Sequence, residues 1–243
     1  MKEMKFEITR TFGKLLMAVA LAMVLAGTSL ALPFRQVEKK DFSKSFKWAQ
    51  NFERLEKRAL DNVKNGGVSE INQANFLLGH YLMRTIYDAY FARMEKAEMT
   101  GVTEDIKVLL QVFEGQPAQA KLEGLLKSVN DGTAKIEQIV EIINTVEKSY
   151  RADLSETEDW FLVYGEWTTC LIGDTRLEND EYIYEDLKAL QEVAANAPEG
   201  VGEQLVNPVG ALLRFAKQDS FSAEDYKEIM SNACNIFDLI FDE

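Results

Sequence analysis

The 243-residue chain carries 27 basic and 40 acidic side chains, a net charge of −13, two cysteines and one histidine. A chain this acidic repels phosphate backbones and anionic membrane surfaces, and no basic stretch with interleaved aromatic residues compensates, so we expect no nucleic-acid partner. The nucleophile motif Gly-x-Ser-x-Gly and the phosphate-binding glycine loop are also missing from the sequence.

Residues 1–31 are predicted to be a secretory signal peptide. Four basic residues lie before an uninterrupted apolar run from Leu15 to Ala26, and small residues at Ser29 and Ala31 mark a cleavage site after Ala31. The alternative is an uncleaved anchor, because the segment from Leu15 to Phe34 carries no charge and is long enough to cross a bilayer. Glycine and hydroxyl residues in its second half favour cleavage.

Cleavage after Ala31 would leave a protein that is exported, either periplasmic or secreted, without stable membrane insertion. Removal of the leader changes the net charge from −13 to −15, because it contains four basic and two acidic residues. We expect residues 32–41 to be a short linker and residues 42–243 to form one helical domain.

The mature chain is predicted to be all-α, because apolar residues recur at helical spacing and no convincing alternation is found. About nine helices are expected, joined by short loops that favour antiparallel helix hairpins. No repeat signature recurs, but an irregular solenoid-like stack of hairpins stays open. The expected helices cover 42–64, 69–97, 104–113, 117–129, 133–151, 155–172, a stretch ending at Ala195, 209–217 and 222 to the C-terminus.

Local signals define the starts of several of these helices. Residues 155–158 read Ser-Glu-Thr-Glu, a capping box, and residues 221–226 combine a cap, an acid at the third position and a hydrophobic staple. The pair Asn207-Pro208 is predicted to be the cap and first turn of the helix at 209–217.

The helix at 69–97 is the element that the rest of the chain must accommodate. It carries two apolar stripes on different faces, so it needs neighbouring helices on two sides. One stripe is rich in aromatic residues and includes His80, which together with Met83, Tyr87 and Phe91 forms our candidate ligand-binding set.

His80 has two interpretations. As a functional residue it would be an axial or metal ligand or a general base. A hydrogen-bonded core histidine is favoured, because a second histidine and the short cysteine spacing of zinc sites are both missing. We therefore assign no metal and no cofactor.

Carboxylates offer two further candidates. Asp159 and Glu166 are seven residues apart on one helix, about 10 Å along its axis, which is at or beyond the long limit for a pair of glycosidase acids. We interpret this line as a solvated polar edge. The run from Asp174 to Glu185 begins and ends like a calcium loop, but Arg176 and Asn179 occupy positions where a ligand and a glycine are needed, so a charged helix start is favoured.

Cys170 and Cys234 are either a disulfide, which an oxidising compartment permits, or two separate buried thiols. Both lie in predicted helices at the margins of apolar stripes, and spacing alone does not decide between these alternatives.

The leading functional interpretation is an exported, soluble helical protein that acts as a non-catalytic binding module for a protein or envelope component. The first alternative is a carrier of a small ligand or cofactor, with a pocket beside the aromatic stripe of the helix at 69–97. The second is an enzyme with an unrecognised carboxylate mechanism. The oligomeric state stays open.

Overall fold

The computed structural model describes residues 71–199, 201–218 and 220–241, and all regular elements in these ranges are helical. The all-α prediction is therefore confirmed for this part of the chain. Residues 1–31, 32–41 and the helix expected at 42–64 lie outside it. The described elements are α3 (Ile71–Glu95), α4 (Thr100–Val112), α5 (Gln119–Asn130), α6 (Ile136–Arg151), α7 (Glu156–Arg176), α8 (Asp180–Ala195), α9 (Glu203–Leu212), the 3-10 helix η2 (Phe215–Lys217) and α10 (Ala223–Phe241).

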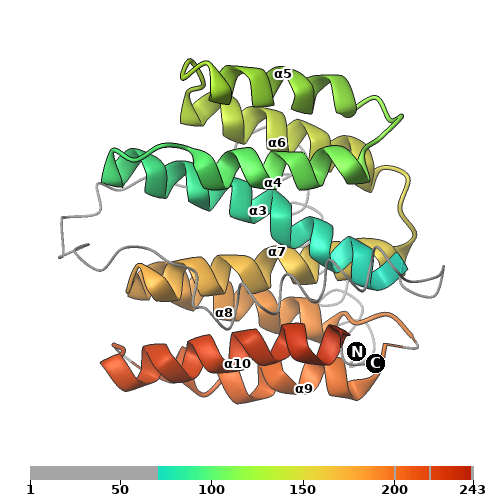
Figure 1. The fold of residues 1–243 in the computed structure, drawn as a ribbon. Helices are drawn as coiled ribbons and strands as arrows, with labels where there is room; N and C mark the ends of the chain where they lie inside the picture. The colour runs from blue at the N-terminus through green and yellow to red at the C-terminus, as the bar shows by residue number, and fades with distance from the viewer. Residues whose placement is uncertain (1–70, 200, 219, 242–243) are drawn as a thin grey trace, which may run out of the picture. The chain divides into compact units, whose positions relative to one another are not determined.

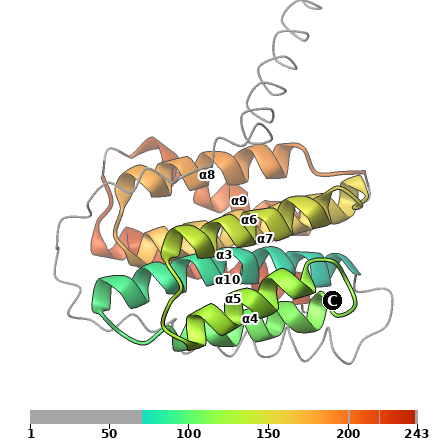
Figure 2. The same ribbon diagram turned by 90° about the horizontal axis from the view of Figure 1, so that it is seen from above.

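The helices are arranged in layers of two. Figure 1 shows α5 and α6 at one end, followed by α3 with α4, then α7 with α8, and finally α9 with α10. The most extensive packing joins α3 to α7, and α3 also packs against α4 and α6. In both views the helix axes run in roughly the same direction (Figure 1 and Figure 2). None of the described helices is long and apolar enough to span a bilayer.

Helix α3 is buried on several faces at once. Phe76 lies edge-on to Phe237 of α10, with ring centroids 4.9 Å apart, and to Tyr164 of α7 at 5.7 Å. On other faces, α4 and α6 cover the helix. The neighbours that two apolar stripes require are therefore present in the structure.

Two glycines allow α3 and α7 to approach until their backbones touch. A Cβ atom added to Gly79 would lie 2.1 Å from the carbonyl oxygen of Leu162, and one added to Gly165 would lie 2.0 Å from that of Phe76. Real Cβ atoms do not come this close to an oxygen. Glycine is unfavourable inside a helix by about 1 kcal/mol relative to alanine, and here the close packing of the two helices offsets that penalty.

Two helix starts form as their sequences predict. The Ser155 hydroxyl accepts a hydrogen bond from the backbone N–H of Glu158, whose carboxylate accepts the Ser155 N–H at 2.8 Å. The same reciprocal pair joins Ser222 and Asp225. Both capping predictions are confirmed.

The helix start predicted at Asn207-Pro208 is wrong. Helix α9 begins at Glu203 and continues through Pro208 to Leu212. A proline here removes one backbone hydrogen bond, to the carbonyl of residue 204. Leu205, Val209 and Leu212 are all buried on one face that spans the proline, and this burial offsets the missing bond.

Candidate functional site

His80 lies fully buried where α3 meets α7 and α10. Its Nδ1 atom is 2.8 Å from Oγ1 of Thr169, and that hydroxyl donates its own hydrogen to the carbonyl of Gly165 at 2.7 Å. Because a hydroxyl has one hydrogen to donate, Nδ1 carries the proton in this contact. The imidazole also lies edge-on to Phe237, with centroids 5.1 Å apart. These contacts link three helices through one side chain.

The other three members of the predicted ligand set lie further along α3. Tyr87 is buried against Gly173 of α7, and Phe91 stacks on it with ring centroids 6.2 Å apart. Met83 is half-buried against the core. The structure brings Tyr87 and Phe91 together, while His80 contacts a different part of α7. Ligand binding by this set stays a prediction; three of its members are buried and Met83 is half-buried.

Tyr87 belongs to a buried acidic cluster formed by α3, α7 and α8. Its hydroxyl donates to Oδ2 of Asp174 at 2.8 Å. The Asp174 carboxyl is also hydrogen-bonded to that of Asp186, whose Oδ2 atom has no further partner among the described residues. Burial raises the pKa of Asp174 to about 6. Burial and the neighbouring Asp174 raise the pKa of Asp186 well above its usual value, so the pair retains a proton at pH values where exposed aspartates have lost theirs.

A second acidic cluster joins the end of α6 to α7. Arg151 donates to both carboxylate oxygens of Asp159, from Nε at 2.6 Å and from Nη2 at 2.9 Å, and from Nη1 to Glu147 at 3.2 Å. Burial alone would lower the pKa of Arg151, but its hydrogen bond to Asp159 and the surrounding carboxylates raise it. The Glu166 carboxyl is hydrogen-bonded to Glu147.

The interpretation of Glu166 as part of a solvated edge is wrong. Its side chain is buried, because the last turns of α6 bring Glu147 and Arg151 over this line of α7. Burial, followed by the charge of Glu147, raises the pKa of Glu166 well above its usual value. Asp159 is half-buried, at the margin of this cluster. The structure therefore assembles a Glu–Glu–Arg–Asp cluster that helical periodicity within α7 could not reveal.

Each acidic cluster brings two carboxyl groups together, Asp174 with Asp186 and Glu147 with Glu166. Within the part of the chain that the structure describes, no set of three or more potential metal ligands converges.

The calcium-like run is helical at both ends, since Asp174 and Arg176 belong to the last turn of α7 and α8 starts at Asp180.

Cys170 and Cys234 are thiols in this structure, and no disulfide joins them. Cys170 is half-buried beside the Tyr87 cluster, and burial followed by the charges of Asp186 and Asp174 raises the pKa of its thiol. A protonated thiol is a poor nucleophile. Disulfide pairing after export stays a prediction.

Two hollows in the described chain lie away from all of these groups. They meet where the α3–α4 turn faces the α5–α6 turn, and they have volumes of about 470 and 640 Å³. We call them together the loop groove. Ala97, Met99 and Ala134 line both hollows. The first is also lined by Ala92, Arg93, Lys96, Lys135, Ile136 and Glu137, and the second by Glu98, Thr100, Thr103, Val129, Asn130 and Gly132.

The loop groove could not be identified from the sequence. Its walls come from two separate segments of the chain, 92–103 and 129–137, and most of the residues that line it are ordinary surface types. The one available signal was the presence of Arg93, Lys96 and Lys135 at helix ends in a strongly acidic chain.

No known family model matches the chain, and neither a curated protein nor a solved structure shows detectable similarity to it. Its class therefore rests on the fold itself, which in the described region is all-helical with helices layered in pairs.

Proposed function

We propose that this is an exported helical protein that acts as a non-catalytic binding module for another protein or an envelope component. One observation carries the proposal. The two hollows of the loop groove are lined by exposed cations and carboxylates, hydroxyls and apolar side chains. By contrast, His80 is buried against Thr169 and Phe237, and the carboxyl pairs with raised pKa values are buried between helices elsewhere. The side chains that a partner could contact in the hollows therefore lie in a different part of the molecule from the buried carboxyl groups.

The order of the helix layers supports the same proposal. Helix pair α5–α6 packs on α3–α4, which packs through α3 on α7–α8, and α7 and α8 in turn contact α9–α10. A stack of hairpins with this solenoid character leaves the turns between helices in rows along its edges, and such stacks commonly bind partners along extended surfaces. The loop groove lies between two turns of neighbouring layers.

Affinity capture from the native envelope tests the proposal. Tagged mature protein is incubated with an envelope extract in the presence or absence of excess untagged protein. We expect at least one component to be retained and to be displaced by the untagged competitor, because a specific site is saturable. Recovery of the same components with and without competitor would contradict a binding function.

A further inference from the structure

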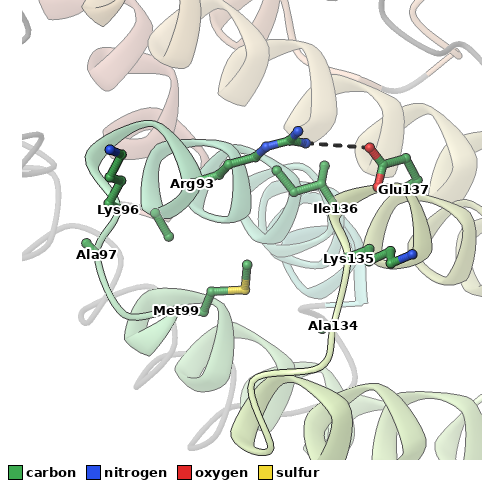
Figure 3. A pocket seen from close by; sticks show the side chains of 9 residues that line it. Arg93, Lys96, Ala97, Met99, Ala134, Lys135, Ile136 and Glu137 are labelled. Carbon is green, nitrogen blue, oxygen red and sulfur yellow. Dashed lines mark ion pairs between the residues drawn. The ribbon is translucent and has the colours of Figure 1, made fainter.

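The loop groove has an apolar floor and a basic rim. Figure 3 shows the Met99 side chain pointing into the space between the end of α3 and Ile136, with Lys96 and Lys135 on opposite sides of the hollow. The guanidinium of Arg93 lies 3.5 Å from Oε1 of Glu137, and both side chains are largely exposed. This hollow therefore contains three cations and one carboxylate.

The local charge is opposite to that of the whole chain, whose net charge is −13. Screening by salt at physiological ionic strength limits the range of exposed charges to about 8 Å, so a docked group experiences chiefly the charges that line the groove, in which cations outnumber carboxylates. The adjoining hollow adds a single carboxylate, Glu98, among neutral lining residues. Charge complementarity therefore selects an anionic occupant.

Lys96 stands in a backbone conformation that favours glycine. The N–H of Ala97 donates to the carbonyl of Ala92 at 2.8 Å, and that of Lys96 donates to Arg93 at 3.3 Å, which is the Schellman motif that ends many helices. Lys96 has a φ of 51°, in the left-handed region. At the same position after α5, beside the same groove, the chain has Gly132 with a φ of 66°.

We propose that the loop groove docks an extended segment of the partner protein in which carboxylates alternate with apolar side chains. The apolar side chains would cover the half-buried Met99 and Ala134, and the carboxylates would bind Lys96 and Lys135. A protein segment fits better than a small molecule, because the groove is open and small-molecule sites enclose most of their ligand. This inference rests on the proposed function.

Synthetic peptides test the groove without requiring the natural partner. Binding of a fluorescent peptide of alternating Leu and Glu is measured by anisotropy, beside a Leu/Lys peptide and a Ser/Glu peptide. We expect the Leu/Glu peptide to bind best and to weaken with salt. The double variant Lys96→Glu/Lys135→Glu should weaken it about tenfold or more, since two attractive contacts become repulsive.

The matched control reverses two exposed lysines outside the groove, Lys188→Glu/Lys217→Glu, and keeps the same total charge. Equal affinity of the two double variants, or equal binding of all three peptides, would overturn the groove proposal. In envelope capture, a partner retained equally by both double variants would do the same while leaving the binding function intact. Groove-dependent peptide binding without any captured component would contradict the proposed function alone.

A single substitution separates binding from stability. Lys96→Gly relieves the left-handed conformation and should raise the midpoint of thermal unfolding by about 2–4 °C while weakening the Leu/Glu peptide. Glu178 has the equivalent position after α7, with a φ of 52°, so Glu178→Gly is the control that should gain stability with unchanged binding. Unweakened binding by a stabilised Lys96→Gly protein would exclude Lys96 from recognition.

Discussion

Asp174 and Asp186 form a buried pair of carboxyl groups. The contribution of this pair to the stability of the fold depends on its protonation. Tyr87 faces the pair from α3, Cys170 from α7 and Glu185 from α8. Both carboxyl groups bind protons more tightly in the folded state than in the unfolded chain. Folding is therefore favoured at low pH by this cluster, and that contribution is lost as pH rises from about 4 through 6 and then through the higher pKa of Asp186.

Asp186→Asn should reduce this dependence, because an amide donates to Asp174 without titrating and leaves Asp174 as the one titrating member of the pair. We expect the variant and the original protein to unfold at similar denaturant concentrations near pH 4. At pH 8 the variant should be more stable by about 1–3 kcal/mol, the range for a buried polar group that has lost its partner. Glu192→Gln, an exposed charge removal on the same helix, controls for net charge. Parallel pH profiles for Asp186→Asn and the original protein would contradict a proton retained by the pair.

Contacts of this kind could not be predicted from the sequence. The Tyr87 and Asp174 side chains meet because α3 and α7 pack together, although 87 residues separate them. Glu166 was assigned to solvent because the period of its own helix places it on the polar edge, and only the position of α6 buries it. His80, by contrast, was correctly expected to favour hydrogen-bonded burial, since the sequence has neither a second histidine nor the short cysteine spacing of a zinc site.

At the scale of elements, the contact between α3 and α7 determines how the central layers meet. Gly79 and Gly165 each face the backbone of the other helix, so the close approach depends on the absence of a Cβ atom at these two positions. Helix periodicity predicted that α3 needs neighbours on two sides. It did not predict that glycines in the middle of α3 and α7 mark the point of closest contact. Caps were predicted correctly because their hydrogen bonds are local, as at Ser155, whereas the continuation of α9 through Pro208 depends on burial against other helices.

Gly79→Ala should therefore be strongly destabilising. The added methyl group overlaps a backbone oxygen that cannot rotate away, so the two helices must separate, and we expect a loss of at least about 2 kcal/mol in the free energy of unfolding. Gly124→Ala in α5 is the matched control, because its Cβ would meet nothing within 4 Å. The control should stabilise the protein by about 0.5–1 kcal/mol. Denaturant unfolding of both variants measures the difference, and similar values would mean that the close crossing is not required.

For the whole molecule, the export prediction concerns residues that the structure does not describe. The leader at 1–31 predicts that protein recovered from outside the cytoplasm begins at Leu32. Intact-mass measurement and N-terminal sequencing of that fraction check the cleavage site. Recovery of the full-length chain in the membrane fraction would instead favour the uncleaved anchor.

The all-helical class of the described residues followed from the sequence, since helical periodicity repeats along most of these segments. The layer order did not follow, because helix faces alone do not specify which hairpins stack. The loop groove was equally inaccessible to sequence analysis, since it exists only where turns of two neighbouring layers face each other.

Photo-crosslinking in the native cell tests the central claim most directly. A photoreactive amino acid replaces Ala97, which is exposed and lines both hollows, or Ala216 of η2, which is exposed outside the groove. The account predicts a discrete crosslinked partner from position 97 and none from position 216. A partner that crosslinks equally at both positions, or at neither, would contradict a binding module that recognises its partner through the loop groove.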